Sequence, residues 1–66
     1  MKKLSVRETF NQLTEVELIQ YAADNDIPMP PTTKTGMISR IMTGSRGTKN
    51  ADMLRADAAE IIANRN

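Results

Sequence analysis

The residues best suited to chemistry in this chain lie in one basic segment, residues 32–49, which contains four cationic side chains and no acidic one. Phosphate oxygens bind cations, hydroxyl donors and the free backbone N–H groups at the start of a helix. The basic segment offers all three kinds of group, and its candidate contacts are Thr33, Lys34, Thr35, Gly36, Arg40, Arg46 and Lys49. We therefore expect these residues to bind the phosphate backbone of a nucleic acid.

The kind of nucleic acid follows from the aromatic content. Phe10 and Tyr21 are the only aromatic residues of the chain, so there is little to stack on single-stranded bases. Duplex DNA is therefore favoured over single-stranded DNA or RNA. A structural interpretation competes with this one, because charges on the outer side of a short helix keep it soluble, and Thr-Lys-Thr is a common way to begin a helix.

The charge distribution also supports a second functional class. Residues 1–31 have a net charge of −2, the basic segment has +4, and residues 50–66 have −1, which together give the chain its net charge of +1. The acidic flank around Glu15, Glu17 and Asp24 could bind a protein as readily as the basic segment could bind DNA. The alternative function is thus a protein-interaction module, such as a small phage-type modulator of a host protein.

Composition argues against catalysis. The chain has no cysteine and no histidine, which excludes disulfides, the usual zinc sites and a histidine general base. A core built from 66 residues should not enclose a catalytic pocket, which usually needs about 300 Å³ or more. We expect no enzyme activity, no catalytic residues, no metal and no cofactor.

The N-terminus does not predict export. MKKL is followed by SVRETFNQ, which lacks the apolar region of a signal peptide. No apolar run approaches the ~20 residues of a membrane helix. The expected location is the cytoplasm, and the nucleoid if the chain binds DNA.

The clearest helix is predicted at residues 14–25, TEVELIQYAADN. Thr14 followed by Glu17 forms a capping box, in which each side chain binds the other residue's backbone N–H. At about 100° per residue, the apolar side chains share one arc and should face the core: Val16, Leu18, Ile19, Ala22 and Ala23. Tyr21 falls at the edge of this arc.

The sequence NDIP should end that helix. Asn25 or Asp26 can adopt the left-handed conformation that terminates a helix, and Ile27 can then fold back onto the last turn. Pro28 prevents the helix from continuing, and the prolines that follow predict an extended loop.

A short helix is predicted within the basic segment, with Thr32, Thr33 or Thr35 as its N-cap. Its apolar residues should point inward: Met37, Ile38, Ile41 and Met42. Lys34 and Arg40 would then be held together on the outside of a rigid support. Two glycines, at positions 44 and 47, should end this helix and reverse the chain.

The remaining segments also have helical periodicity. Ser5 and Glu8 could form another capping box, which predicts a short helix with Val6, Phe10 and Leu13 on one side. Residues 50–65 contain five alanines and an apolar stripe of Leu54, Ala58, Ile61 and Ile62, from which Met53 is excluded. The predicted fold class is all-α, a single domain over residues 1–66 with three or four helices and an Ala-rich C-terminal helix at 50–65.

Residues 13–41, within a predicted helix–loop–helix unit at 13–43, resemble the SAP, LEM and HeH (helix–extended loop–helix) group of small domains. The residues that match the pattern of these families are Leu13, Thr14, Glu17, Leu18, Ile27, Lys34, Met37, Ile38, Arg40 and Ile41. One departure is that these families often have glycine where Asp26 precedes Ile27. The resemblance implies a helix–extended loop–helix core. It also implies duplex DNA binding if the chain is SAP-like, protein binding if it is LEM-like, and a bacterial or phage setting if it is HeH-like.

Overall fold

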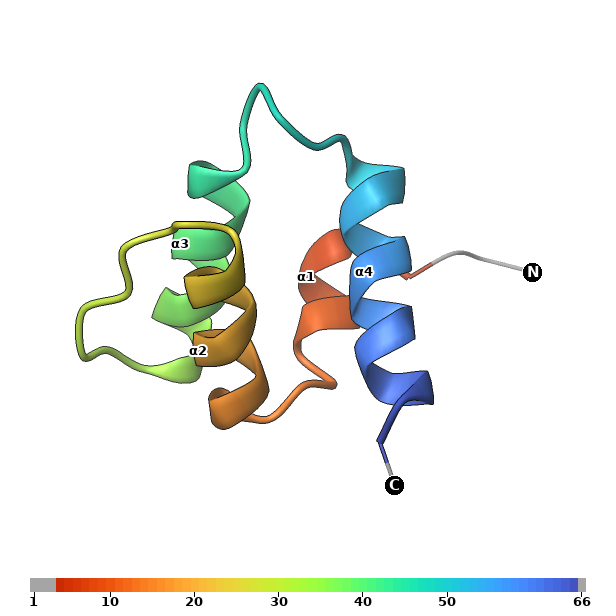
Figure 1. Cartoon of the computed structure of the whole chain (residues 1–66), viewed down its shortest axis with the longest axis horizontal. Helices are drawn as coiled ribbons and strands as arrows, with labels where there is room; N and C mark the ends of the chain where they lie inside the picture. The colour runs from red at the N-terminus through yellow and green to blue at the C-terminus, as the bar shows by residue number, and fades with distance from the viewer. Residues whose placement is uncertain (1–3, 66) are drawn as a thin grey trace.

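The computed structural model describes residues 4–65, and within that range it contains four helices and no strand. The helices are α1 (Val6–Phe10), α2 (Glu15–Asp24), α3 (Lys34–Gly44) and α4 (Ala51–Ala63). Helix α1 packs mainly on α4, α2 packs on α3, and a smaller contact between α1 and α3 joins the two pairs (Figure 1). The all-α prediction is confirmed. No helix of the described residues is both long enough and apolar enough to span a bilayer.

Each helix begins at a side chain that binds an otherwise unpaired N–H of the first turn, because the first N–H groups of a helix have no partner within it. The N-caps are Ser5, Thr14, Thr33 and Asn50. Both predicted capping boxes, Ser5 with Glu8 and Thr14 with Glu17, are present. Of the three threonines considered for α3, Thr33 is the cap. The starts of the helices are therefore encoded locally.

The end of α2 forms as the sequence predicted. Asp26 has a φ of 57°, in the left-handed region. The N–H of Ile27 then reaches the carbonyl of Ala22 at 2.8 Å, and the N–H of Asp26 reaches that of Ala23 at 3.2 Å. This pair of bonds is a Schellman motif, and it buries the Ile27 side chain to 8% exposure. Asp26 thus takes the left-handed conformation that glycine adopts without steric cost.

One core joins all four helices. Phe10, Leu13, Leu18, Ile38 and Ile41 are its largest fully buried side chains. The ring of Phe10 in α1 meets that of Tyr21 in α2 at a centroid distance of 5.4 Å and an angle of 59°, which is a tilted aromatic pair. The prediction that Met37, Ile38 and Ile41 point inward is confirmed, whereas Met42 is only partly buried. The short helix α1 is stable only because its side chains fill this core.

The predicted inner face of α2 is wrong. Val16 is 76% exposed and Ile19 is 46% exposed, and Ala23 is exposed as well. The residues that α2 buries are Leu18, Tyr21 and Ala22. On the helical wheel, the buried face lies roughly 90° away from the centre of the apolar arc. The large Tyr21 ring is buried in preference to the smaller Val16, and an apolar strip of α2 is left facing solvent.

Candidate interaction surfaces

The structure gives the predicted nucleic-acid contacts separate roles. Lys34 is partly buried, and its Nζ donates to the backbone carbonyl of Asn11 at 2.7 Å. Asn11 is the C-cap of α1, where the helix dipole favours a cation. Lys34 therefore joins the end of α1 to the start of α3, and its ammonium is directed toward α1.

The polar groups at the start of α3 are also partly engaged. The Thr33 hydroxyl oxygen accepts the N–H of Gly36 at 3.1 Å, so this N–H is not available to a ligand. Thr35 is exposed and lies in an open cavity of about 300 Å³ with Arg7, Glu8, Asn11 and Ile38. The cavity is lined by one cation, Arg7, and one carboxylate, Glu8, so it has no net positive charge to attract phosphate.

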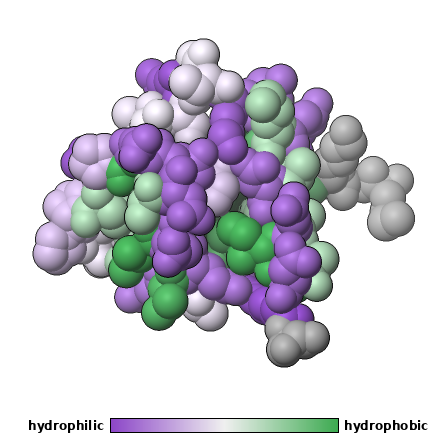
Figure 2. Space-filling view, viewed as in Figure 1, coloured by the Kyte–Doolittle hydropathy of each residue, from purple (hydrophilic) through white to green (hydrophobic). Residues whose placement is uncertain are grey.

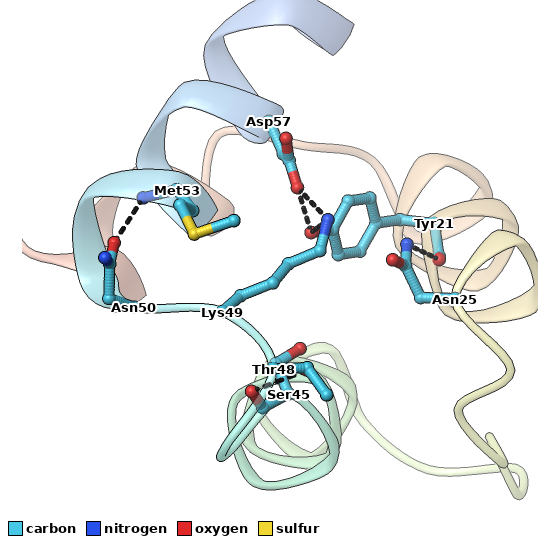
Figure 3. Close-up of polar contacts among 8 residues, drawn as sticks. All are labelled: Tyr21, Asn25, Ser45, Thr48, Lys49, Asn50, Met53 and Asp57. Carbon is cyan, nitrogen blue, oxygen red and sulfur yellow. Dashed lines mark hydrogen bonds and ion pairs between the residues drawn. The ribbon is translucent and has the colours of Figure 1, made fainter.

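Lys49 is the clearest departure from the predicted site. Its ammonium forms an ion pair with Asp57, donates to the Tyr21 hydroxyl at 3.3 Å and lies 5.3 Å from the centroid of the Tyr21 ring (Figure 3). The Tyr21 hydroxyl in turn donates to Asp57 Oδ2 at 2.5 Å. We call Tyr21, Lys49 and Asp57 the polar triangle. It joins α2, the loop before α4, and α4, so Lys49 is a structural residue.

The polar triangle shifts the ionisation of all three groups. The hydrogen bond to Asp57 raises the pKa of Lys49. Burial alone would raise the pKa of Asp57, but the hydrogen bonds from Lys49 and Tyr21 outweigh it and lower that pKa. Burial, reinforced by the hydrogen bond to Asp57, raises the pKa of Tyr21 to about 12. At neutral pH the triangle therefore holds one cation, one anion and a neutral phenol.

Arg40 and Arg46 are the two predicted cations that remain available. Both side chains are exposed, and no carboxylate within residues 4–65 pairs with either. Six residues separate Lys34 from Arg40, which places them roughly 120° apart around α3. Since Lys34 also reaches toward α1, the two side chains leave different sides of the helix. The seven predicted residues thus do not form one continuous donor surface.

A larger feature, which sequence reasoning missed, is an open groove of about 550 Å³ between α2 and α4. Its walls come from both helices, and the polar triangle lies within it. The residues that line this α2–α4 groove are Val16, Glu17, Gln20, Tyr21, Asp24, Asn25, Lys49, Asp57, Glu60, Ile61 and Asn64. Figure 2 shows apolar surface over the lower part of α2 and beside α4, with hydrophilic atoms around both. The groove is open and lies between helices, so it does not test the expectation that the core encloses no catalytic pocket.

One end of the α2–α4 groove is closed by an ion pair. Arg65 donates to Glu17 through Nε at 2.7 Å and through Nη2 at 2.5 Å, and Nη2 also reaches the carbonyl of Gln12 at 3.0 Å. Hydrogen bonds from Arg65 and from the Thr14 backbone N–H lower the pKa of Glu17 to about 2. This bidentate ion pair anchors the C-terminal end of the described chain to the start of α2. No local pattern in the sequence indicates this contact, because its two residues are 48 positions apart.

The groove is lined by groups suited to binding a ligand. It contains carboxylates, amides, one engaged ammonium and apolar side chains, and its lysine is held charged by Asp57. Across residues 4–65, no cluster of three carboxylates has the arrangement needed to hold a metal ion. The groove can therefore bind a ligand through apolar contact and through its negative rim.

Comparison with known proteins gives no identity: the chain matches no family model, no curated protein and no solved structure.

Proposed function

We propose that this chain is a small, non-enzymatic protein-interaction module of the cytoplasm, whose partner binds in the α2–α4 groove. The observation that carries the proposal is the exposure of Val16, which at 76% is the most exposed large apolar side chain described, on the wall of an open groove. The resemblance to the SAP, LEM and HeH group remains a prediction, and LEM-type binding of proteins agrees with this proposal.

The physical basis is the apolar surface that the fold leaves uncovered. Helix α2 is rotated so that it buries Tyr21, and as a result Val16 and Ile19 face water. Burial of one such side chain is worth about 1.5–3 kcal/mol, and a contiguous exposed apolar area is typical of binding surfaces. The groove between α2 and α4 gives a bound segment two walls to contact.

Site-directed photo-crosslinking in cells that express the chain tests this proposal. A photoreactive benzophenone amino acid at Val16 should crosslink to a protein partner. The same amino acid at Thr43, which is exposed on α3, should not. The purified partner should then shift the backbone amide signals of the groove and leave those of α3 unchanged. Equal crosslinking at the two positions, or a partner that leaves the groove signals in place, would refute the proposal.

Duplex DNA binding is retained as a second candidate because Arg40 and Arg46 are exposed in a segment without acidic residues. With Lys49 engaged by Asp57 and Lys34 bonded to the carbonyl of Asn11, two cations remain, and two phosphate contacts give a slope of about −1.8 for log K against log [salt]. An NMR titration with short duplex DNA at low salt should then shift the signals of residues 34–46. A spectrum that stays unchanged at low salt, where electrostatic binding is strongest, would eliminate this candidate.

A further inference from the structure

We propose that the occupant of the α2–α4 groove is a positively charged protein segment that inserts an apolar side chain between α2 and α4. This inference rests on the proposed function, because it specifies the chemistry of the partner at the same site. It follows from three features of the groove: its uncompensated negative charge, the apolar side chains on its two walls, and the internal pairing of its one cation, Lys49.

The groove contains more negative charge than the fold neutralises. Four carboxylates line it, and its only cation is Lys49. Lys49 is paired with Asp57, and Glu17 is paired with Arg65 from just outside the groove. Asp24 and Glu60 are left without a cationic partner in the part of the chain that the structure describes, residues 4–65. The groove therefore keeps a net charge of about −2 after its internal ion pairs are counted.

The two uncompensated carboxylates lie on opposite walls. Asp24 is at the end of α2, where its Oδ1 accepts a hydrogen bond from Gln20 at 2.9 Å, and Glu60 is in the second half of α4. A segment lying between the helices passes both carboxylates, so lysine or arginine side chains on its two flanks can each pair with one. Acidic segments and phosphates are repelled from the same position.

The apolar contribution comes from side chains on the same two helices. Val16 in α2 is exposed, Ile61 in α4 is partly buried, and the Tyr21 ring is part of the groove lining. Tyr21 is only 6% exposed and Lys49 lies over its ring, so the apolar contact with a ligand comes mainly from Val16 and Ile61. An aliphatic side chain placed there would cover Val16 and Ile61 together. This adds an affinity that charge alone does not give.

Designed peptides can test the charge and the apolar anchor separately. The probes are three capped amphipathic peptides of about 14 residues, or about four helical turns. The first contains leucine on one face and lysine on the other, the second replaces each lysine by glutamate, and the third replaces each leucine by alanine. Backbone amide shifts of the isotope-labelled protein report where each peptide binds and how tightly.

The Leu/Lys peptide should shift the signals of Val16, Glu60 and Ile61. It should bind about tenfold or more tightly than the Leu/Glu peptide, because two attractions become repulsions. The Ala/Lys peptide should also bind about tenfold more weakly than the Leu/Lys peptide, because the apolar anchor is lost. Equal affinity of the Leu/Lys and Leu/Glu peptides would overturn the charge inference.

A matched pair of variants separates a specific contact from general electrostatic attraction. Glu60→Gln and Glu15→Gln each remove one negative charge from an exposed helical position, but only Glu60 lines the groove. Glu60→Gln should weaken the binding of the Leu/Lys peptide about two- to fivefold, and Glu15→Gln should change it much less. Equal effects of the two substitutions would overturn the proposal.

Dilution of the free protein tests a different occupant. Groove signals that move with protein concentration, with no peptide present, would show that a second copy covers the groove and would overturn the inference of a foreign basic segment. The proposed function is judged separately, by crosslinking at Val16, which needs no basic peptide. A module that crosslinks through its groove but does not prefer the Leu/Lys peptide would retain the function and refute only this inference.

Discussion

The ion pair between Lys49 and Asp57 should contribute measurably to the stability of the fold. The two side chains keep only 24% and 31% of their exposure, which is less than a surface ion pair and more than a buried one. Exposed pairs are worth about 0.2–1 kcal/mol, and hydrogen bonds to charged groups about 1.5–3 kcal/mol. We therefore expect a coupling free energy of about 1–2 kcal/mol between these residues.

A double-mutant cycle measures this coupling. Lys49→Met keeps the aliphatic stem beside the Tyr21 ring, and Asp57→Asn keeps the size of the side chain and its ability to accept a hydrogen bond. The free energy of unfolding of the chain, the two single variants and the double variant is obtained from urea denaturation followed by circular dichroism. Each kcal/mol lost should also lower Tm by about 4–8 °C in a domain of this size.

The control is the exposed ion pair between Asp52 and Arg55, where Asp52 keeps 75% of its exposure. Its coupling free energy should be about 0.5 kcal/mol or less. If the Lys49–Asp57 coupling is no larger than that of the control, then Lys49 is not held by the fold. Its ammonium would in that case be available again as a phosphate contact, and our assignment of Lys49 to a structural role would be refuted.

Four further measurements test the structure. The chain has one tyrosine, so its near-ultraviolet absorbance should titrate near pH 12. Because folding raises the pKa of Tyr21 from 10.0, the stability that the neutral Tyr21 hydroxyl contributes is complete below pH 10 and is lost as the pH rises toward 12. The carboxyl carbon signal of Glu17 should titrate near pH 2, because folding lowers the pKa of this carboxyl group from 4.5. The stability that the ionised Glu17 contributes is complete above pH 4.5 and is lost as the pH falls from 4.5 toward 2. Asp26→Gly should stabilise the fold by about 0.5–1 kcal/mol, since glycine adopts the positive φ of 57° without steric cost; an unchanged or lower free energy of unfolding would contradict the turn geometry. Gly44→Ala should destabilise it by about 1–2 kcal/mol, because the new Cβ would lie 2.8 Å from Cγ2 of Ile27, and the penalty should disappear in an Ile27→Ala background.

The helices and their ends could be predicted because short-range interactions determine them. Thr14 and Glu17 cap α2 from within its first turn, and Asp26 ends it through hydrogen bonds to the turn just before. The inward face of α3 was predicted because Met37 and Ile41 stand one turn apart with no competing large apolar residue on the other side. In these cases the groups that interact are within five residues of each other.

The face that α2 buries could not be read from its own periodicity. Its apolar residues indicated Val16 and Ile19, but a tyrosine that meets Phe10 and reaches Asp57 buries more surface than either. The orientation of a short helix is set by what it packs against, and that partner is distant in sequence. The exposed strip on α2, and with it one wall of the groove, is a consequence of this competition.

The sequence by itself determined an all-helical chain, the capping boxes at Ser5 and Thr14, a left-handed turn at Asn25 or Asp26, and the absence of cysteine and histidine chemistry. The structure placed that turn at Asp26 and chose Thr33 as the N-cap of α3. Only the tertiary structure decided which charges remain available, because the contacts that engage them span the chain: Lys34 with Asn11 at a separation of 23 residues, Tyr21 with Asp57 at 36, and Arg65 with Glu17 at 48. A charge pattern gives the sign and number of the groups in a segment. Their availability depends on the distances to other charges after folding, and those distances are properties of the packed helices.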